Sequence, residues 1–355
     1  MNRRRFLHHA SASFVAALSA RCSSEVPTRG DRRTRIEQLM ARLYQKDEFA
    51  GEILVAEKGH VVYEGAFGMA DHGTGRPYTT DTRSCLASLS KPITATAIMM
   101  LVEQTLLSYD DPLSTFLPGF SDTMGAVTIR HLLTHTSGMP DYPDLNVDHP
   151  GITNAEILAA LQKVQTPVFP PGQKYQYCNG GYVLLALIVE QISRDPLPRF
   201  LESKIFMPIG MTSTFVLTSL DQKTPNVARG YERVGGADDF VGMETGASGV
   251  YSTVKDLLRF DQALYTDAPV KQQTLAQAFK PFPVREGRTM YGFGWNIVDD
   301  IPGRRVWHQG NTAGFRAFIE RRLADRITVI MLTNGGDTNR MAINDSIQRI
   351  LRDNP

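Results

Sequence analysis

Apolar and polar positions follow two different periods along this chain, and the changes of period predict its organisation. Between residues 36 and 43, apolar side chains recur at helical spacing, which predicts a first amphipathic helix. Residues 51–56 and 61–65 are β-type runs, and the segment 57–60 between them contains a glycine, which is typical of a hairpin. The chain is therefore expected to begin its fold with a helix and two antiparallel strands, after a polar linker at 23–33.

The middle of the chain changes to helical periodicity and capping signals. Residues 88–106 are rich in Ala, Met and Leu, which predicts a buried helix. Thr153 and Thr253 each precede an acidic residue by three positions, an arrangement that begins a helix. Further helices are predicted at 128–133 and 181–192.

The end of the chain returns to β-type runs separated by glycine-containing turns, and a last helix is expected at about 338–352. Because strands lie at both ends and helices between them, we expect an α/β (α+β) fold, with an antiparallel sheet flanked by helices and an inserted helical lobe. The sheet lobe would comprise about 34–80 and 285–353, and the helical lobe about 81–284. The late strands are predicted at 292–298, 304–308, 315–321 and 327–333.

Composition narrows the class of protein. The chain has 355 residues, of which 42% are hydrophobic and 21% charged, so it can bury a sizeable core and does not read as disordered or coiled-coil. With 38 basic and 37 acidic residues the formal net charge is +1, so no overall basic field indicates nucleic-acid binding. We expect no nucleic-acid partner.

The charge balance changes at the N-terminus. Residues 1–22 hold four arginines and no acid, and they contain a short apolar stretch at 10–20, which predicts an export signal. Its Arg-Arg-x-Phe-Leu segment resembles the twin-arginine type, which indicates an exported, periplasmic or secreted protein. Lipid anchoring at Cys22 is disfavoured because Arg21 stands where a small residue is wanted. No apolar stretch reaches the length of about 18 residues needed for a transmembrane helix.

Candidate chemistry starts with a serine and a lysine. Ser88 and Lys91 form a Ser-x-x-Lys at the start of the predicted buried helix, so the two side chains share a helix face. A neutral Lys91, its pKa lowered by burial, could take the serine proton. A second Ser-x-x-Lys, Ser252 with Lys255, follows a capping threonine and is expected to expose its lysine. The chain lacks a Gly-x-Ser-x-Gly elbow, a His-Glu-x-x-His and a Walker loop.

Two further motifs follow in order. Tyr177 and Asn179 form a Tyr-x-Asn after a loop rich in Pro and Gly, and His308 with Gly310 forms a His-x-Gly at the end of a predicted strand. A tyrosine beside a lysine can lose its proton more easily, because an ammonium favours phenolate. Taken singly, Tyr177 could be a buried structural tyrosine, and His308 could lie at a strand end on the surface.

The order Ser-x-x-Lys, Tyr-x-Asn, His-x-Gly resembles that of the serine penicillin-recognising enzymes. The similarity is to the group of class C β-lactamases, D-Ala-D-Ala carboxypeptidases, D-aminopeptidases and β-lactamase-like esterases, and it implies a serine β-lactamase/DD-peptidase-like fold. One catalytic domain of two lobes would then span 34–353. Supporting stretches are 131–140 (HLLTHTSGMP), 207–211 (MPIGM), 291–295 (YGFGW) and 310–315 (GNTAGF).

The resemblance implies a role for each motif residue. Ser88 would be the acylated nucleophile, and Lys91 and Tyr177 would share proton transfer. Asn179 would bind substrate and hold Lys91. The substrate-binding wall would include His308, Gly310 and Asn311, with the backbone N–H groups of Ser88 and Asn311 forming the oxyanion hole. No cofactor is implied.

His308 stands where many relatives carry a lysine. This difference disfavours efficient β-lactamase activity, because a histidine is mostly neutral near pH 7. His131 and His135 have a spacing that can bind zinc, but hydrogen bonding at a helix end is favoured and no metal is predicted. Cys85 and Cys178 flank two motifs and could approach one another; ordinary buried thiols are favoured over a disulfide.

These observations predict an exported serine hydrolase that forms an acyl-enzyme on amide or ester bonds. The substrate would be small or a peptidoglycan-type peptide: a D-amino-acid peptide, a β-lactam or a short ester. Two alternatives stay open: a promiscuous short-chain esterase, and a penicillin-binding sensor that is acylated without turnover. A monomer is expected.

Overall fold

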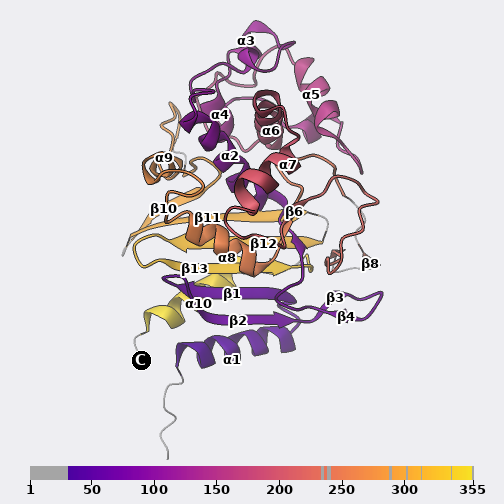
Figure 1. Cartoon of the computed structure of the whole chain (residues 1–355), viewed down its shortest axis with the longest axis vertical. Helices are drawn as coiled ribbons and strands as arrows, with labels where there is room; N and C mark the ends of the chain where they lie inside the picture. Colours follow the sequence, from indigo (N-terminus) through magenta and orange to yellow (C-terminus); the bar gives the residue numbers. More distant parts are fainter. Residues whose placement is uncertain are drawn as a thin grey trace, which may run out of the picture.

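The computed structural model describes residues 31–353 apart from 233–235, 238–240, 288–289, 301–302, 313 and 337. Its centre is a six-stranded antiparallel sheet with the strand order β10-β11-β12-β13-β1-β2 (Figure 1). The predicted export signal, Cys22 and most of the predicted linker lie outside the described residues. The strands are β1 (Gly51–Glu57), β2 (His60–Phe67), β10 (Asn296–Asp300), β11 (Gly303–Thr312), β12 (Phe315–Arg322) and β13 (Ile327–Thr333).

The two ends of the chain meet in the middle of this sheet. Strand β1 pairs antiparallel with β13 in continuous register, from Gly51 opposite Thr333 to Glu57 opposite Ile327. The predicted hairpin joins β1 to β2, and its tight turn places both Lys58 and Gly59 at positive φ. The pattern of strands at both ends thus becomes one sheet, and the predicted antiparallel architecture is confirmed.

Helices cover both faces of the sheet. Helices α1 (Arg32–Gln45) and α10 (Arg340–Arg352) pack on one face around a core that includes Ile53 and Val329. The alternate residues Leu54 and Ile330 point to the opposite face and join the core of the helical part. Successive residues of β1 and β13 are therefore both buried, which explains their nearly continuous apolar sequences.

Helix α8 (Val254–Ala263) lies on that second face, in front of β12, β13 and β1 (Figure 1). It is tied to the sheet by a fully buried ion pair in which Arg321 Nε of β12 donates to Asp261 Oδ1 over 2.5 Å. Thr328 Oγ1 of β13 donates to the other oxygen of the same carboxylate, at 2.8 Å. The buried charge of Arg321 is thus matched by a hydrogen-bonded partner, as burial requires.

The helical part sits beyond β10, β11 and β12, with α2 and α6 running through its core (Figure 1). The predicted caps are present: Thr153 forms a capping box with Glu156, and the Thr253 side chain accepts from the N–H of Asp256. Its helices are α2 (Lys91–Glu103), α3 (Asp122–Gly125), α4 (Ile129–Leu133), α5 (Asn154–Gln162), α6 (Asn179–Ser193), α7 (Leu197–Leu201) and α9 (Gln272–Ala278). Every helix in the described part of the chain is too short or too polar to cross a bilayer.

Several boundaries differ from the sequence prediction. Strand β11, expected over 304–308, continues to Thr312, so His308 lies within the strand and not at its end. Helix α1 begins at Arg32, inside the predicted linker, because the Asp31 side chain caps it by accepting from the N–H of Thr34. The strand expected over 292–298 begins only at Asn296. The residues before it form a turn in which Gly294 has φ +78°, a conformation that a strand does not permit.

Candidate active site

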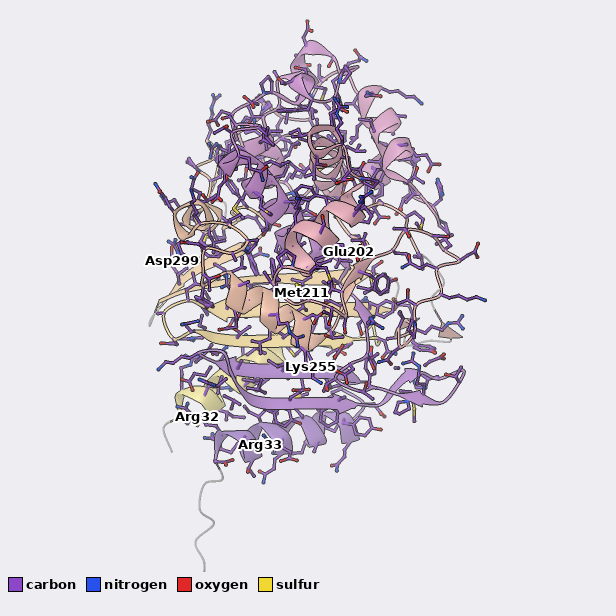
Figure 2. The ribbon with its side chains drawn as sticks, in the orientation of Figure 1. Arg32, Arg33, Glu202, Met211, Lys255 and Asp299 are labelled. Carbon is purple, nitrogen blue, oxygen red and sulfur yellow. The ribbon has the colours of Figure 1, made fainter. Side chains whose placement is uncertain are left out.

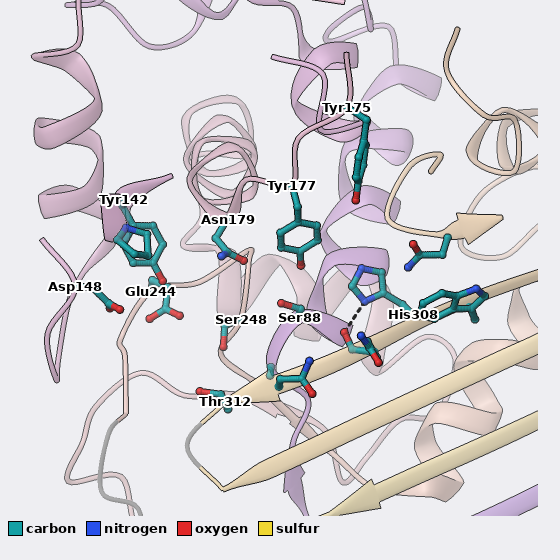
Figure 3. Close-up of a pocket in the computed structure, with 16 residues that line it drawn as sticks. Ser88, Tyr142, Asp148, Tyr175, Tyr177, Asn179, Glu244, Ser248, His308 and Thr312 are labelled. Atoms are coloured by element: carbon teal, nitrogen blue, oxygen red, sulfur yellow. Dashed lines mark hydrogen bonds between the residues drawn. The ribbon is translucent and has the colours of Figure 1, made fainter. Parts of the chain in front are cut away.

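Ser88 lies on a tight turn between a short strand and a helix. The chain leaves β5 (Ser84–Cys85), passes through Ala87 at φ +46°, and enters the 3-10 helix Ala87–Ser90 that continues into α2. A positive φ at a residue other than glycine stores strain, and such strain is common where a side chain must be presented to a ligand. The turn places Ser88 on the wall of a cavity of about 520 Å³ (Figure 3).

Strand β11 runs directly against this turn. A Cβ atom at Gly310 would come within 2.0 Å of the Leu86 carbonyl oxygen, so only glycine permits the close approach. The glycine of the His-x-Gly motif is therefore explained by packing: it lets the end of β11, with Asn311, share one cavity wall with Ser88.

Lys91 is fully buried at the first turn of α2, and its ammonium nitrogen has three polar partners. Nζ lies 2.9 Å from Ser88 Oγ, 2.8 Å from Asn179 Oδ1 and 3.0 Å from the Ala247 carbonyl oxygen. The last two oxygens can only accept. A neutral lysine would donate its two N–H bonds to them, which leaves its lone pair facing the Ser88 hydroxyl. The hydrogen-bond geometry thus suits a base that removes the serine proton.

The electrostatic environment favours that neutral form. Burial lowers the pKa of Lys91 from 10.5 to about 7, and the carboxylates of Asp141 and Glu244 only partly oppose this. The direction agrees with the expectation drawn from the sequence. Near pH 7 a substantial share of the protein therefore holds Lys91 as a free amine.

Asn179 and Tyr177 flank the lysine from the start of α6. Asn179 Nδ2 donates to Asp141 Oδ2 over 2.8 Å, which fixes its amide so that Oδ1 faces Lys91. Asp141 Oδ1 also accepts from the backbone N–H of Gly180 at 2.8 Å. Asp141 is thus a supporting residue that the motifs did not reveal, because it comes from the loop after α4.

Tyr177 corrects one expectation. The Lys91 ammonium nitrogen lies 4.8 Å from the centre of the Tyr177 ring, over its face. Burial nevertheless raises the pKa of Tyr177 well above its usual value, while the neighbouring Ser88 hydroxyl works in the opposite direction. The lysine does not favour phenolate here, because burial dominates and Lys91 is itself largely neutral. Tyr177 therefore stays protonated, and Lys91 is the group of the two that can accept a proton near pH 7.

His308 lies in the cavity wall on the other side of Ser88 from Asn179 (Figure 3). Its Nδ1 is 2.8 Å from the Gln309 carbonyl oxygen, which can only accept, so Nδ1 carries the proton. Its Nε2 then accepts from the Tyr291 hydroxyl at 2.9 Å. Burial and the nearby Lys91 lower the pKa of His308 to about 3, so the ring is neutral. Both ring nitrogens are occupied within the protein, which differs from the expected direct contact with substrate.

Asn311 stands beside His308 at the end of β11. Its Oδ1 accepts from Arg340 Nη2 at 2.6 Å, and the same guanidinium donates to the Gly310 carbonyl oxygen at 2.7 Å. Arg340 therefore holds the strand end in place from the first turn of α10. The side-chain oxygen of Asn311 is therefore engaged in this anchor, while the residue also lines the cavity.

The cavity also contains two carboxyl groups that the motifs did not reveal. Glu244 and Asp148 lie on the side of Ser88 away from His308, together with Tyr142 (Figure 3). Both acids lie outside helices and strands: Asp148 follows the 3-10 helix Tyr142–Leu145, and Glu244 precedes β9 (Val250–Ser252). The described lining is Ala87, Ser88, Tyr142, Pro143, Asp148, Tyr175, Tyr177, Asn179, Glu244, Ser248, Asn296, Trp307, His308, Gln309, Asn311 and Thr312.

The second Ser-x-x-Lys is not part of this cavity. Ser252 is buried and its Oγ lies 2.8 Å from Thr214 Oγ1, while Lys255 donates to Asp81 at 2.9 Å. Lys255 lies in the first turn of α8, and Figure 2 shows it next to the sheet. Lys255 is thus part of a surface ion-pair group and is not positioned to activate Ser252.

The two histidines of the His-x-x-x-His segment and the two cysteines have structural surroundings. His131 accepts from the N–H of Thr128 and completes a capping box, and His135 accepts from the N–H of Cys178. Both are hydrogen bonded at the end of α4, as expected. Cys85 and Cys178 are buried free thiols, so they do not form a disulfide.

The fold and the site together define a class of protein. A Ser-x-x-Lys pair, held in a cavity between an antiparallel sheet and a helical insertion, is typical of a serine hydrolase. The chain is a member of the beta-lactamase family, whose model matches residues 33–353. The predicted family and fold class are thereby confirmed.

Three relatives carry different names. Penicillin-binding protein 4* of Bacillus subtilis is 36% identical over 86% of this chain and 72% of its own length. Esterase EstB of Burkholderia gladioli is 27% identical over 84% of this chain and 90% of its own length. A D-aminopeptidase of Brucella anthropi is 28% identical over 80% of this chain, but the match spans only 56% of that longer protein. The family therefore contains proteins named for different substrates.

Solved structures repeat the fold. An octameric penicillin-binding protein homologue from Pyrococcus abyssi superposes with a TM-score of 0.80 at 27% identity, covering 90% of this chain and 77% of its own. A class C beta-lactamase has a TM-score of 0.77 at 22% identity, over 91% of this chain and 97% of its own, a likeness of fold. The serine-hydrolase activity predicted from the sequence is supported by these relatives, whereas their different names leave its substrate open.

Proposed function

We propose that this protein hydrolyses amide or ester bonds through an acyl-enzyme formed on Ser88. The observation that carries the proposal is the contact of 2.9 Å between Lys91 Nζ and Ser88 Oγ, with Lys91 buried and held by two other acceptors. A base with a pKa near 7 is well matched to removing a proton at neutral pH. The wider site supplies the other parts that acyl transfer needs.

Acylation follows from this arrangement. Lys91 Nζ takes the proton from Ser88 Oγ while the oxygen attacks the carbonyl carbon of the substrate. The backbone N–H groups of Ser88 and Asn311 would stabilise the tetrahedral oxyanion, and loss of one such donor typically costs about 100-fold or more in rate. The Lys91 ammonium then returns its proton to the leaving group, with the Tyr177 hydroxyl, which stays protonated, as the second donor on that side.

Deacylation reverses the roles. Water enters the cavity, gives a proton to the Lys91 amine and attacks the acyl carbon, and Ser88 Oγ leaves and recovers its proton from the same nitrogen. Asn179 positions Lys91 throughout, because Asp141 fixes the orientation of its amide.

We further infer that residues 1–22 direct export of the chain, as the basic and apolar pattern of that segment suggests, to the periplasm or outside the cell. Residues 34–353 would then act as a single catalytic domain, in which both parts of the chain contribute to the cavity. A fusion of residues 1–30 to a reporter tests the export proposal; an uncleaved reporter that stays in the cytoplasm would contradict it.

Labelling with a fluorophosphonate, read by intact mass, tests the nucleophile. We expect one adduct on the wild-type chain, none on Ser88→Ala, and an adduct on Ser252→Ala. Labelling that persists in Ser88→Ala and disappears in Ser252→Ala would overturn the assignment.

Turnover distinguishes the open alternatives. We expect product from at least one of nitrocefin, p-nitrophenyl butyrate and a D-alanyl-D-alanine peptide. Preference for the butyrate ester would favour the esterase, and a lasting penicillin adduct without product would favour the sensor.

A further inference from the structure

The cavity beside Ser88 has an uneven charge distribution. Among the described residues that line it, Glu244 and Asp148 are acidic, and none is a lysine or an arginine. His308, at the opposite end, is neutral and has both ring nitrogens occupied. The cavity thus holds two carboxyl groups on one side of the nucleophile and no lysine or arginine side chain among its described lining residues.

The carboxyl group of Glu244 is buried without full hydrogen bonding. Only 9% of the residue is exposed, and its Oε2 is buried without a hydrogen-bond partner. A buried carboxylate oxygen that lacks a donor is costly, by about 1–3 kcal/mol or more when charged, so such groups call for an explanation. The side chain nevertheless faces the cavity, on the same side as Asp148 (Figure 3).

The carboxylate of Asp141, by contrast, has hydrogen-bond donors for both of its oxygens. Asp141 is satisfied by the amide of Asn179 and the N–H of Gly180, so it is part of the support for Lys91. Glu244 Oε2 has no such partner. Burial raises the pKa of Glu244 to about 7, and its own backbone N–H and the nearby Lys91 only partly oppose this. Lys91 Nζ is already committed to Ser88, Asn179 and Ala247. An internal salt bridge therefore does not account for Glu244.

We propose that Glu244 and Asp148 form a subsite for an ammonium group on the acyl part of the substrate. An ammonium supplies the donor that Glu244 Oε2 lacks, and the exposed Asp148 adds a second opposite charge on the same side. The inference rests on the proposed acyl transfer at Ser88, and it names the chemical class that the site prefers: acyl groups with a free amine, joined to leaving groups without a carboxylate.

Three matched pairs of p-nitroanilides test the subsite. D-alanyl is compared with isobutyryl, β-alanyl with butyryl, and 5-aminopentanoyl with hexanoyl, so that each pair exchanges one ammonium for one methyl group. The readout is the ratio of kcat/KM within a pair. Any influence that Glu244 exerts through Lys91 acts on both members and cancels in the ratio.

We expect the wild-type protein to favour the ammonium member of at least one pair by 10-fold or more. Glu244→Gln should reduce that ratio by about 10- to 100-fold, the range of a charge-assisted hydrogen bond, and Asp148→Asn by a smaller factor. Asp144→Asn is the matched control, because Asp144 is exposed on the same loop but does not line the cavity. It should keep the wild-type ratio.

Two results would overturn the subsite. One is a wild-type ratio near one in all three pairs; the other is a preference that survives in both Glu244→Gln and Asp148→Asn. Binding of the corresponding primary amides to Ser88→Ala, measured by calorimetry, gives the same ratio without chemistry. Failure of fluorophosphonate labelling therefore refutes the proposed function, whereas equal binding of both members of every pair refutes the subsite.

Discussion

Replacing Lys91 by methionine should change how the free energy of unfolding depends on pH. In the unfolded chain the lysine binds a proton below its ordinary pKa of 10.5, but in the folded protein burial lowers that pKa to about 7. Between these values the unfolded state holds more protons, so the free energy of unfolding of the wild-type protein rises with pH. Methionine does not titrate, and the variant lacks this contribution.

The size of the effect follows from the shift. The difference between 10.5 and about 7, at 1.36 kcal/mol per pH unit, corresponds to about 5 kcal/mol at full extent. Between pH 7 and pH 9, proton linkage at Lys91 should raise the free energy of unfolding of the wild-type protein by about 2 kcal/mol. Methionine also leaves the Asn179 and Ala247 oxygens without a donor, but that loss is the same at both pH values and cancels in the comparison.

Urea unfolding followed by tryptophan fluorescence measures this difference. The stability of Lys91→Met relative to the wild-type protein should fall by about 2 kcal/mol from pH 7 to pH 9. Lys255→Met is the matched control. The Lys255 ammonium is paired with Asp81 and Glu64 at the surface, and its pKa is raised. The stability of Lys255→Met relative to the wild-type protein should therefore change little between pH 7 and pH 9. A flat comparison for Lys91→Met, or one that rises with pH, would refute the view that Lys91 is buried as a neutral base.

Three other measurements test separate features. First, kcat/KM should rise as the pH increases through about 7, because the Lys91 amine is the form that accepts the serine proton; an unchanging profile from pH 5.5 to 8.5 would contradict this. Second, Gly310→Ala should lower kcat/KM by about 100-fold or more, because its Cβ would meet the Leu86 oxygen and displace the oxyanion hole, whereas Gly335→Ala, where no atom lies within 4 Å of the added carbon, should be near wild type. Third, Cys85 and Cys178 should both be alkylated by iodoacetamide in urea without reductant; a disulfide-linked peptide pair in the mass spectrum would show that they are bonded.

Much of the fold could be predicted because local signals and tertiary structure agree. The capping box at Thr153 and the glycine turn before β2 act within a few residues, so their effect survives without knowledge of the rest of the molecule. The strand predicted at 292–298 failed for the opposite reason. Its apolar residues do enter the core, but Gly294 turns at the backbone of Pro92, which periodicity cannot show.

In the candidate site, too, some contacts could be predicted from the sequence and others could not. Ser88 and Lys91 are one helical turn apart, so their contact could be predicted from spacing, and Asn179 joins them through a motif. Asp141 and Glu244 belong to loops without a repeating pattern, and they reach the site only when those loops are packed. The contacts of His308 also depend on tertiary packing: burial and the nearby Lys91 lower its pKa to about 3, and the Tyr291 hydroxyl occupies its Nε2.

The pairing of β1 with β13 has a consequence for biosynthesis. A ribosome must deliver Ile327–Thr333, almost the last part of the chain, before Gly51–Glu57 gains its central neighbour. Until then the apolar β1 strand presents an unpaired edge, which favours association with chaperones or with other unfinished chains. A premature stop that removes β13 and α10 should therefore yield degraded or aggregated material, so that only full-length chains can assemble the cavity.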